Sequence, residues 1–225
     1  MSLFYAPTLQ QEATHYQLSE EESKHCIKVL RMQVGTSIEL INGQGLQAFA
    51  VLEDAHPKRA IVQITSRHLH PPTPALHIAM APTKHMDRIE WYLEKATELG
   101  LSKLSFLNCD RCERKQVNME RLEKIAVSAM KQSKRFYLPQ LEDLQSFEAF
   151  IASYPQGYIG HCEESSKIGL KEIKAGLPFL IGPEGDFSKN EIELARVSGY
   201  QAVDMSAFRL RTETAALLAT TALLP

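Results

Sequence analysis

A glycine-bearing turn near the carboxyl end holds the first residues whose types and spacing fit a binding site. Phe179–Ile181 reads as the end of an apolar strand, and Gly182–Gly185 (GPEG) follows it directly. Two glycines around Pro-Glu predict a tight turn whose backbone can approach a ligand closely. Ser188 and Glu191 match a capping box, so a helix is expected to start there and to run to Gly199. Such a strand, turn and helix leave free backbone amides at the end of a strand.

A second segment, Leu210–Ala215 (LRTETA), follows a short expected strand at Ala202–Met205. Its Thr212 and Glu213 are ordinary helix-start residues, since an acid there complements the helix dipole. Arg211 is different, because a cation at a helix N-terminus is locally unfavourable, and its presence predicts an anionic partner. We expect the two segments to fold together into a slot beside a buried Arg211, with a helix over Ala215–Leu224 closing the chain.

A third feature is a stripe of basic residues on the expected helix Asn118–Arg135. At 100° per residue, its cations fall on one face and its apolar residues on the other; the cations are Arg121, Lys124, Lys131 and Arg135. The whole chain has a formal net charge of −2, so any contact with a polyanion must come from a local patch such as this one. A solvated helix face and an RNA-binding surface both fit the stripe.

The four cysteines do not predict a metal or redox site. Cys109 and Cys112 form a single CxxC, and a structural zinc site needs a second pair at suitable spacing. Met1–Pro7 has no basic region and no apolar run typical of a signal peptide, and no segment has the length of a membrane-spanning helix. We therefore expect a cytoplasmic protein with reduced thiols, no bound metal and no contact with a membrane.

The elements that must position these residues form two expected domains. Residues 1–70 are β-rich, with a short helix at Glu20–Arg31 and strands at Thr36–Ile41, Leu46–Leu52 and Arg59–Thr65. Pro71, Pro72 and Pro74 interrupt this pattern and mark a boundary. Residues 74–225 then alternate apolar runs with helical patterns, which indicates an α/β domain built on a mostly parallel sheet; the runs lie at Ala75–Ala81, Leu104–Leu107, Tyr158–His161, Phe179–Ile181 and Ala202–Met205.

The motifs together resemble the ribosomal RNA small subunit methyltransferase E family. The likeness is carried by GPEGDFS at 182–188, LRTETA at 210–215, KATELG at 95–100, AMKQSKR at 129–135, HCIKVLR at 25–31 and NGQG at 42–45. These segments span nearly the whole chain in the family's order. Asp186, Ser206 and Phe208 depart from the family pattern, which has glycine, glycine and arginine there.

The resemblance implies a PUA-like β-barrel that binds RNA at 1–70 and a SPOUT-class domain with a C-terminal trefoil knot at 74–225. It implies a homodimer that uses S-adenosyl-L-methionine to methylate N3 of one uridine in 16S rRNA of the small ribosomal subunit. Alternatives are an RNA-binding assembly factor without turnover, a nucleotide phosphate enzyme, which would lack a Walker lysine, and the same chemistry on another RNA.

Site residues follow from the resemblance and from the residues themselves. Arg211 is expected to be catalytic, and either water or Glu213 would accept the proton. The expected cofactor pocket consists of His161, Leu180, Ile181, Gly182, Glu184 and Gly185 on one side and of Met205, Ser206, Ala207, Phe208, Arg209 and Leu210 on the other. Glu184 fits a structural carboxylate nearly as well as a ligand contact. The expected RNA contacts are His25, Arg31 and the basic stripe.

Overall fold

A computed structural model describes residues 1–224. The chain divides into two compact units: Met1–Pro72 with Met130–Leu138, and Thr73–Ala129 with the residues from Pro139 onward. The strands of the first unit are β1 (Leu3–Tyr5), β2 (His15–Gln17), β3 (Ser37–Ile41), β4 (Leu46–Asp54) and β5 (Ile61–Leu69). The strands of the second unit are β6 (His77–Met80), β7 (Lys103–Asn108), β8 (Gln140–Ser146), β9 (Gly157–Gly160), β10 (Ile168–Gly169), β11 (Pro178–Ile181) and β12 (Tyr200–Asp204). The α-helices are α1 (Glu20–Lys24), α2 (Met86–Leu99), α3 (Met119–Ser133), α4 (Phe147–Ser153), α5 (Lys189–Val197) and α6 (Thr212–Ala222).

The first unit is built on a five-stranded sheet in the order β1-β3-β4-β5-β2. Strand β4 alternates buried and part-exposed residues, so Leu46, Ala48, Ala50 and Leu52 point into one core. The three strands expected from the sequence are present as β3, β4 and β5. Strands β1 and β2 were not predicted, because three residues are too few to show an alternating pattern.

The helix expected over Glu20–Arg31 is wrong in its second half. Helix α1 ends at Lys24 and continues as a π-helical turn over His25–Val29, in which the Leu30 N–H reaches back to the His25 carbonyl. The wider turn keeps Cys26 in the core, and Arg31 leaves it with a left-handed φ of 53°. Helical periodicity could not distinguish this turn from a regular helix.

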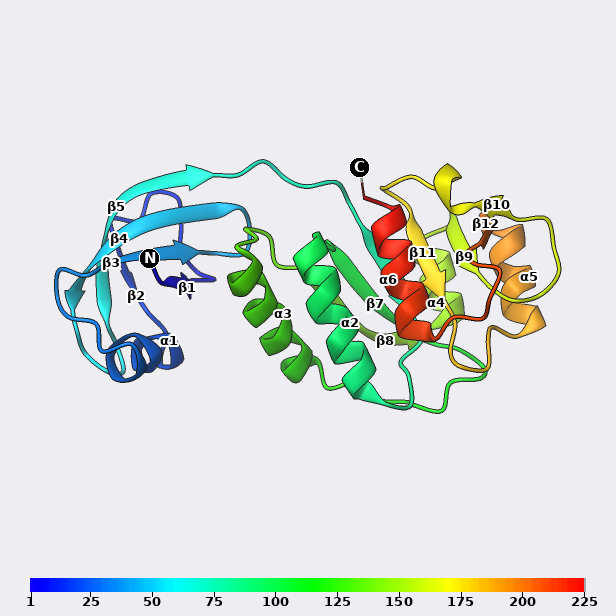
Figure 1. Cartoon of the computed structure of the whole chain (residues 1–225), viewed down its shortest axis with the longest axis horizontal. Coiled ribbons are helices and arrows are strands. Elements are labelled where there is room, and N and C mark those ends of the chain that lie inside the picture. The colour runs from blue at the N-terminus through cyan, green and yellow to red at the C-terminus, as the bar shows by residue number, and fades with distance from the viewer. Residues whose placement is uncertain (225) are drawn as a thin grey trace. The chain divides into compact units, whose positions relative to one another are not determined.

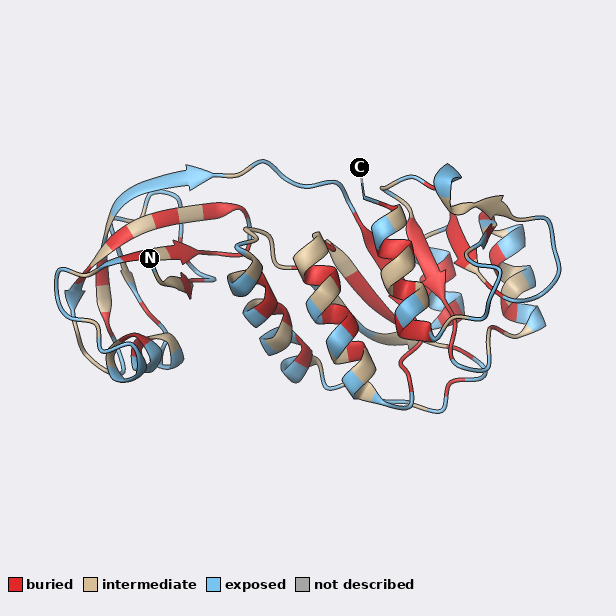
Figure 2. Ribbon diagram, in the orientation of Figure 1, coloured by how far each residue is buried: buried red, intermediate tan, exposed pale blue. Residues whose placement is uncertain are grey.

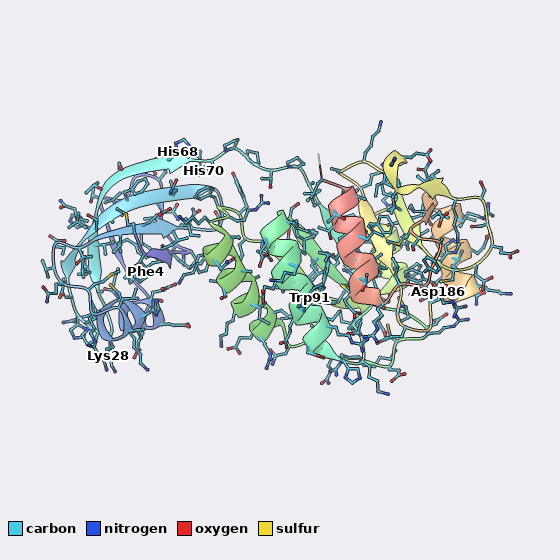
Figure 3. The ribbon with its side chains drawn as sticks, in the orientation of Figure 1. Phe4, Lys28, His68, His70, Trp91 and Asp186 are labelled. Atoms are coloured by element: carbon cyan, nitrogen blue, oxygen red, sulfur yellow. The ribbon has the colours of Figure 1, made fainter. Side chains whose placement is uncertain are left out.

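The segment Met130–Leu138 joins the first unit through its backbone. Gly45 donates to the Phe136 carbonyl at 2.9 Å, and Leu138 donates to the Gly43 carbonyl at the same distance. His70 stacks on Phe136 with ring centroids 3.4 Å apart, and its carbonyl accepts from the Tyr137 hydroxyl; His70 is labelled in Figure 3. A loop and a strand end far apart in the sequence are therefore fastened together.

The second unit contains a seven-stranded sheet in the order β10-β12-β9-β11-β6-β7-β8, with every pair parallel. The parallel sheet expected from the sequence is thus confirmed. Central strands β6 and β11 are buried along their whole length, as Figure 2 shows in red. Helices α2 and α6 lie side by side on one face of the sheet in Figure 1, whereas α4 and α5 pack together against strands on its other face. Edge strand β8 is largely polar, which is why its pattern was not recognised.

The register of the three strands β9, β11 and β12 decides where the loops emerge. Gly160 pairs with Ile181 on one side and with Val203 on the other. The residues that follow these three strand ends therefore leave the same edge of the sheet next to one another. The glycine turn after β11 and the loop after β12 come from this edge.

We predict that Gly45→Ala destabilises the first unit by about 3–4 kcal/mol. Gly45 has φ +93°, and a Cβ there would overlap the Tyr137 hydroxyl. Gly35 is the matched control, because it has φ +88° but no atom within 4 Å of the position that a methyl group would take. Gly35→Ala should therefore show only the backbone strain, about 1–2 kcal/mol. Denaturant unfolding followed by circular dichroism, with hydrogen exchange at β4 amides, measures both; equal losses would contradict the role of Tyr137.

Candidate functional site

A cavity of about 830 Å³ lies at the carboxyl ends of β9, β11 and β12. Its lining comes from three segments, Gly160–Glu164, Ile181–Asp186 and Val203–Thr212, together with Arg88, Arg111, Lys167 and Ala215. The structure thus brings together the two segments that the sequence placed on opposite walls. Of the residues expected there, Leu180 alone does not line the cavity, since it is fully buried in the core cluster that includes residues of α4 and α5.

The turn after β11 is held by its own side chains. Asp186, labelled in Figure 3, has a left-handed φ of 64°, a conformation that aspartate tolerates better than most residues. Its carboxylate accepts from the Cys162 N–H and from the Phe187 N–H, both at 2.8 Å. The departure from glycine therefore ties the turn to the end of β9. Ser188 then caps α5, and the predicted capping box with Glu191 is present.

Gly182 has a steric reason to be glycine. A Cβ at this position would lie 3.1 Å from the Phe187 ring and 3.2 Å from the Phe187 nitrogen. Thr212 donates its hydroxyl to the Gly182 carbonyl at 3.3 Å, so the first turn of α6 is fixed directly against the glycine turn. The two segments singled out in the sequence are therefore hydrogen-bonded to each other.

Glu184 is exposed and accepts the Lys84 N–H at 3.0 Å. The sequence left two roles open for Glu184, a structural carboxylate and a ligand contact. This hydrogen bond is a structural role. It joins the glycine turn to the loop after β6, so a fourth strand, besides β9, β11 and β12, helps to stabilise the cavity edge.

Two guanidinium groups that the sequence pattern did not single out also hold the loops at this end of the sheet. Arg111 donates from one nitrogen, Nη1, to the Gly185 carbonyl at 2.7 Å and to the Phe187 carbonyl at 3.3 Å. Arg114 donates to the Thr83 and Lys84 carbonyls at 3.2 and 2.8 Å. The CxxC spacing marks the cysteines on either side of Arg111. Nothing in the sequence indicates that Arg111 binds Gly185, which is 74 residues away.

Cys109 and Cys112, the CxxC pair on either side of Arg111 in the sequence, are buried thiols. The Cys109 N–H donates to the Cys112 sulfur at 3.3 Å across a tight turn. Hydrogen bonding from Cys109 lowers the pKa of the Cys112 thiol, whereas that same bond and burial raise the pKa of Cys109. All four cysteines are free thiols. Among residues 1–224 no group of three or more His, Cys, Asp or Glu side chains is arranged to hold a metal ion.

Two buried polar atoms at this end of the unit have no hydrogen-bond partner within residues 1–224: Nδ1 of His161 and Oε2 of Glu213. His161 lines the cavity, and its pKa is lowered by burial and by nearby Lys167, which favours the neutral ring. The other oxygen of Glu213 lies 3.8 Å from Nε of Arg88. Buried polar atoms without partners are rare and call for an explanation, such as a missing ligand.

The expectation of a buried guanidinium at Arg211 is wrong for this chain taken alone. Helix α6 begins at Thr212, three residues before the expected start at Ala215, and Arg211 is its N-cap residue. The N-cap backbone is extended, with φ −71° and ψ 155°, and Arg211 lies exposed on the cavity lining.

None of the residues expected to contact RNA is among the residues that line this cavity, and most of the stripe is ion-paired. Arg121 binds Glu90 through two nitrogens at 2.5 and 2.7 Å, and Lys124 binds Glu120 at 2.6 Å. In the first unit, Lys131 binds Glu22 at 2.5 Å. His25 and Arg31 are exposed, and Arg135 is half-buried. A projection of this one helix cannot show all of these pairs, since Glu90 lies on α2 and Glu22 on α1.

Comparison of the chain with known protein families shows which class of protein it belongs to. The family described as RNA methyltransferase domain matches residues 70–224, and the RNA methyltransferase PUA domain matches residues 18–65. The expected α/β methyltransferase domain with a PUA-like domain is confirmed; its SPOUT class and its trefoil knot stay predictions.

The chain belongs to the ribosomal RNA small subunit methyltransferase E family. It is 30% identical over 230 residues to the protein of that name from Synechocystis sp., covering 96% of this chain and 75% of the relative. It is similar to the crystal structure of a probable rRNA-methyltransferase from Porphyromonas gingivalis, with 35% identity, a TM-score of 0.88 and coverage of 98% and 96%. A ribosomal RNA small subunit methyltransferase E from Neisseria gonorrhoeae, bound to S-adenosyl methionine, is 26% identical with a TM-score of 0.84 and coverage of 99% and 96%.

We predict that Arg111→Ala loosens the glycine turn without unfolding the unit. Loss of hydrogen bonds to the Gly185 and Phe187 carbonyls should raise amide exchange in residues 182–188 about tenfold, as expected for about 1.4 kcal/mol. Arg114→Ala is the matched control, because its guanidinium holds Thr83 and Lys84 instead. Hydrogen–deuterium exchange with mass spectrometry separates the two; the same exchange pattern in both variants would disprove two separate clamps.

Proposed function

We propose that this protein transfers the methyl group of S-adenosyl-L-methionine to N3 of a uridine in 16S rRNA of the small ribosomal subunit. The observation that carries the proposal is the cavity formed where three adjacent loops leave β9, β11 and β12. Its volume of about 830 Å³ falls in the range of small-molecule sites. The chain's family includes a member crystallised with this cofactor.

The residues present fit the cofactor. Glu163, Glu164, Glu184 and Asp186 give two lining segments an acidic character that suits a sulfonium and an ammonium group. The unpaired Nδ1 of His161 offers a hydrogen-bonding position for a polar ligand atom. We propose that Ile181, Gly182 and Gly185 form one wall, and that the backbone of Met205–Leu210 forms the other. When bound, the cofactor supplies an activated methyl group, so the protein must mainly position it and prepare the nucleophile.

Preparation of the nucleophile falls to Arg211 in this proposal. Uridine N3 carries a proton, which would pass to water or to Glu213, and as it leaves, negative charge spreads to O2 and O4 of the base. A positioned cation stabilises that charge. The exposed side chain of Arg211 at the cavity mouth is accessible to an RNA base arriving from solvent.

RNA binding outside the cavity completes the proposal. His25 and Arg31 of the PUA-like domain and the cations of the basic stripe (Arg121, Lys124, Lys131 and Arg135) are the proposed contacts. Three of these cations would have to exchange a carboxylate partner for a phosphate, which offsets part of the binding free energy. We further propose a homodimer acting in the cytoplasm; among residues 1–224 no helix combines the length and apolarity that crossing a membrane requires.

The proposal predicts one added methyl group in 16S rRNA. Small subunits from cells lacking the gene should accept label from methyl-labelled S-adenosylmethionine, and nucleoside mass mapping should locate it on N3 of uridine. Label on another nucleoside or in transfer RNA would overturn the stated substrate. Cofactor binding without transfer to any RNA would favour an assembly factor without turnover.

Arg211→Ala should reduce kcat by about 100-fold or more, the scale seen when one group that stabilises developing charge is removed. The Kd for S-adenosylmethionine should change by less than about twofold, because Arg211 is proposed to act on the base rather than on the cofactor. Arg211→Lys keeps the charge but not the fork of donors, so an intermediate kcat is expected. Isothermal titration and single-turnover assays give both numbers. Unchanged turnover in the alanine variant would remove Arg211 from the mechanism.

A further inference from the structure

Phe208 has an exposed aromatic ring at the mouth of the cavity. The residue is 82% exposed, more than any other large hydrophobic residue in positions 1–224. It lies in the loop between β12 and α6, whose residues line the cavity. A ring this exposed contributes nothing to the core, so its position in the loop needs another explanation.

The backbone and the ring of Phe208 lie in different surroundings. The Phe208 N–H donates to the Ser206 hydroxyl at 3.1 Å, which closes a short turn and fixes the backbone beside the cavity. The high exposure of the residue means that its ring extends into solvent rather than filling the cavity. A ligand held inside by the loop backbone would therefore leave the ring available to a second molecule.

The charges around Phe208 indicate what that second molecule is. Arg209 and Arg211 follow Phe208 closely in the sequence, both are exposed, and the loop Met205–Leu210 contains no acid. Of the five acids that line the cavity, Glu163, Glu164, Glu184 and Asp186 come from the other two lining segments, and Asp204 is the last residue of β12, before this loop. An aromatic face next to guanidinium groups is typical of surfaces that bind single-stranded nucleic acid, where the ring stacks on a base and the cations contact phosphates.

A protein partner fits this surface less well. The neighbours of Phe208 in the loop are Ser206, Ala207 and Arg209, all exposed. One ring among polar and small residues is not the contiguous apolar patch typical of a protein interface.

We propose that Phe208 stacks on the unpaired RNA base that enters the cavity mouth, and that Arg209 binds a phosphate next to that base. The inference rests on the proposed function, since it names the residue that positions the substrate base against the cavity. The substrate is then an extruded or single-stranded base, because a base within a duplex cannot present its face to the ring; that this base is a uridine comes from the proposed function.

Phe208→Leu and Phe208→Trp test the stacking. Leucine keeps apolar bulk but removes the π-face, so KM for small subunits should rise about tenfold, the effect of losing one stacked base; the Kd for S-adenosylmethionine should stay unchanged. Tryptophan should restore or improve KM. Val197→Ala, which truncates a 64%-exposed residue on α5 outside the cavity, is the control for loss of an exposed apolar group.

Three outcomes would overturn the proposal. Weaker cofactor binding in Phe208→Leu with unchanged KM for RNA would place the ring on the adenine. A change in oligomeric state measured by light scattering would show that a second copy covers it. Equal behaviour of the leucine and tryptophan variants would show that aromatic character is irrelevant.

A binding assay separates this inference from the proposed function. With Trp91→Phe as background, Phe208→Trp carries the chain's single tryptophan. Stacking on a short uridine-containing single strand should quench its fluorescence, even if no methyl group is transferred. Absence of quenching with active methylation would refute the stacking and leave the proposed function intact.

Discussion

The parallel register of β9, β11 and β12 is the constraint on which the site depends. Gly160, Ile181 and Val203 are paired neighbours, so the three chain segments that follow them begin side by side. Since strands in such a sheet all point the same way, their carboxyl ends form a common edge where ligands bind. A shift of one residue in β11 would move Gly182 out of line with His161 and turn every side chain of that strand to the other face. The cavity therefore follows from the sheet rather than from any single loop.

The loops at this edge are held in place mainly by charged side chains, two of them within the glycine turn and one from another segment. Arg111 fixes the Gly185 and Phe187 carbonyls, and Glu184 accepts from Lys84. Asp186 links the glycine turn to Cys162. Hydrogen bonds to charged groups are stronger than neutral ones, which suits loops that have little apolar burial of their own. Asp186 also shows how a departure from the family pattern can be compensated: the residue adopts the left-handed backbone and uses its carboxylate for two further bonds.

The sequence predicted the parts of this arrangement that have a local signal. Apolar runs predicted β6, β9, β11 and β12, and the Ser188–Glu191 spacing predicted the capped start of α5. The glycine turn and the RTET segment were recognised because their residues stand together in the chain. The clamps by Arg111 and Arg114 had no such signal, since they depend on pairing between distant segments. The π-helical turn at His25–Val29 and the exposure of Arg211 were missed for the related reason that periodicity fixes neither helix ends nor burial.

The second unit also contains a polar cluster around His77 whose members bond to one another. It shows that a polar atom without a partner indicates a ligand site better than a buried polar residue does. At the opposite edge of the sheet, near the starts of β6, β7 and β8, His77 bonds to Ser105 at 2.8 Å, and Ser105 donates to Glu142 at 2.6 Å. Lys103 completes the cluster by donating to Glu142 and to the Tyr154 hydroxyl. Burial and Lys103 lower the pKa of His77 to about 4. The His77 ring nevertheless has its hydrogen-bond and ring partners within the protein and does not need a ligand to satisfy it.

His161 contrasts with His77 in this respect. Its pKa is also lowered, mainly by burial, but its Nδ1 has no partner within residues 1–224 and the residue lines the cavity. If a perturbed pKa were the only criterion, the His77 cluster would be taken for the functional site, because the pKa shift is large there. Leaving a buried polar atom unpaired costs about 1–3 kcal/mol, so a fold retains one mainly where a ligand can satisfy it. The two unpaired atoms, on His161 and Glu213, both follow the carboxyl-terminal edge of the sheet. The distribution of unsatisfied polar groups therefore identifies the same edge as the strand register does, and by an independent physical criterion.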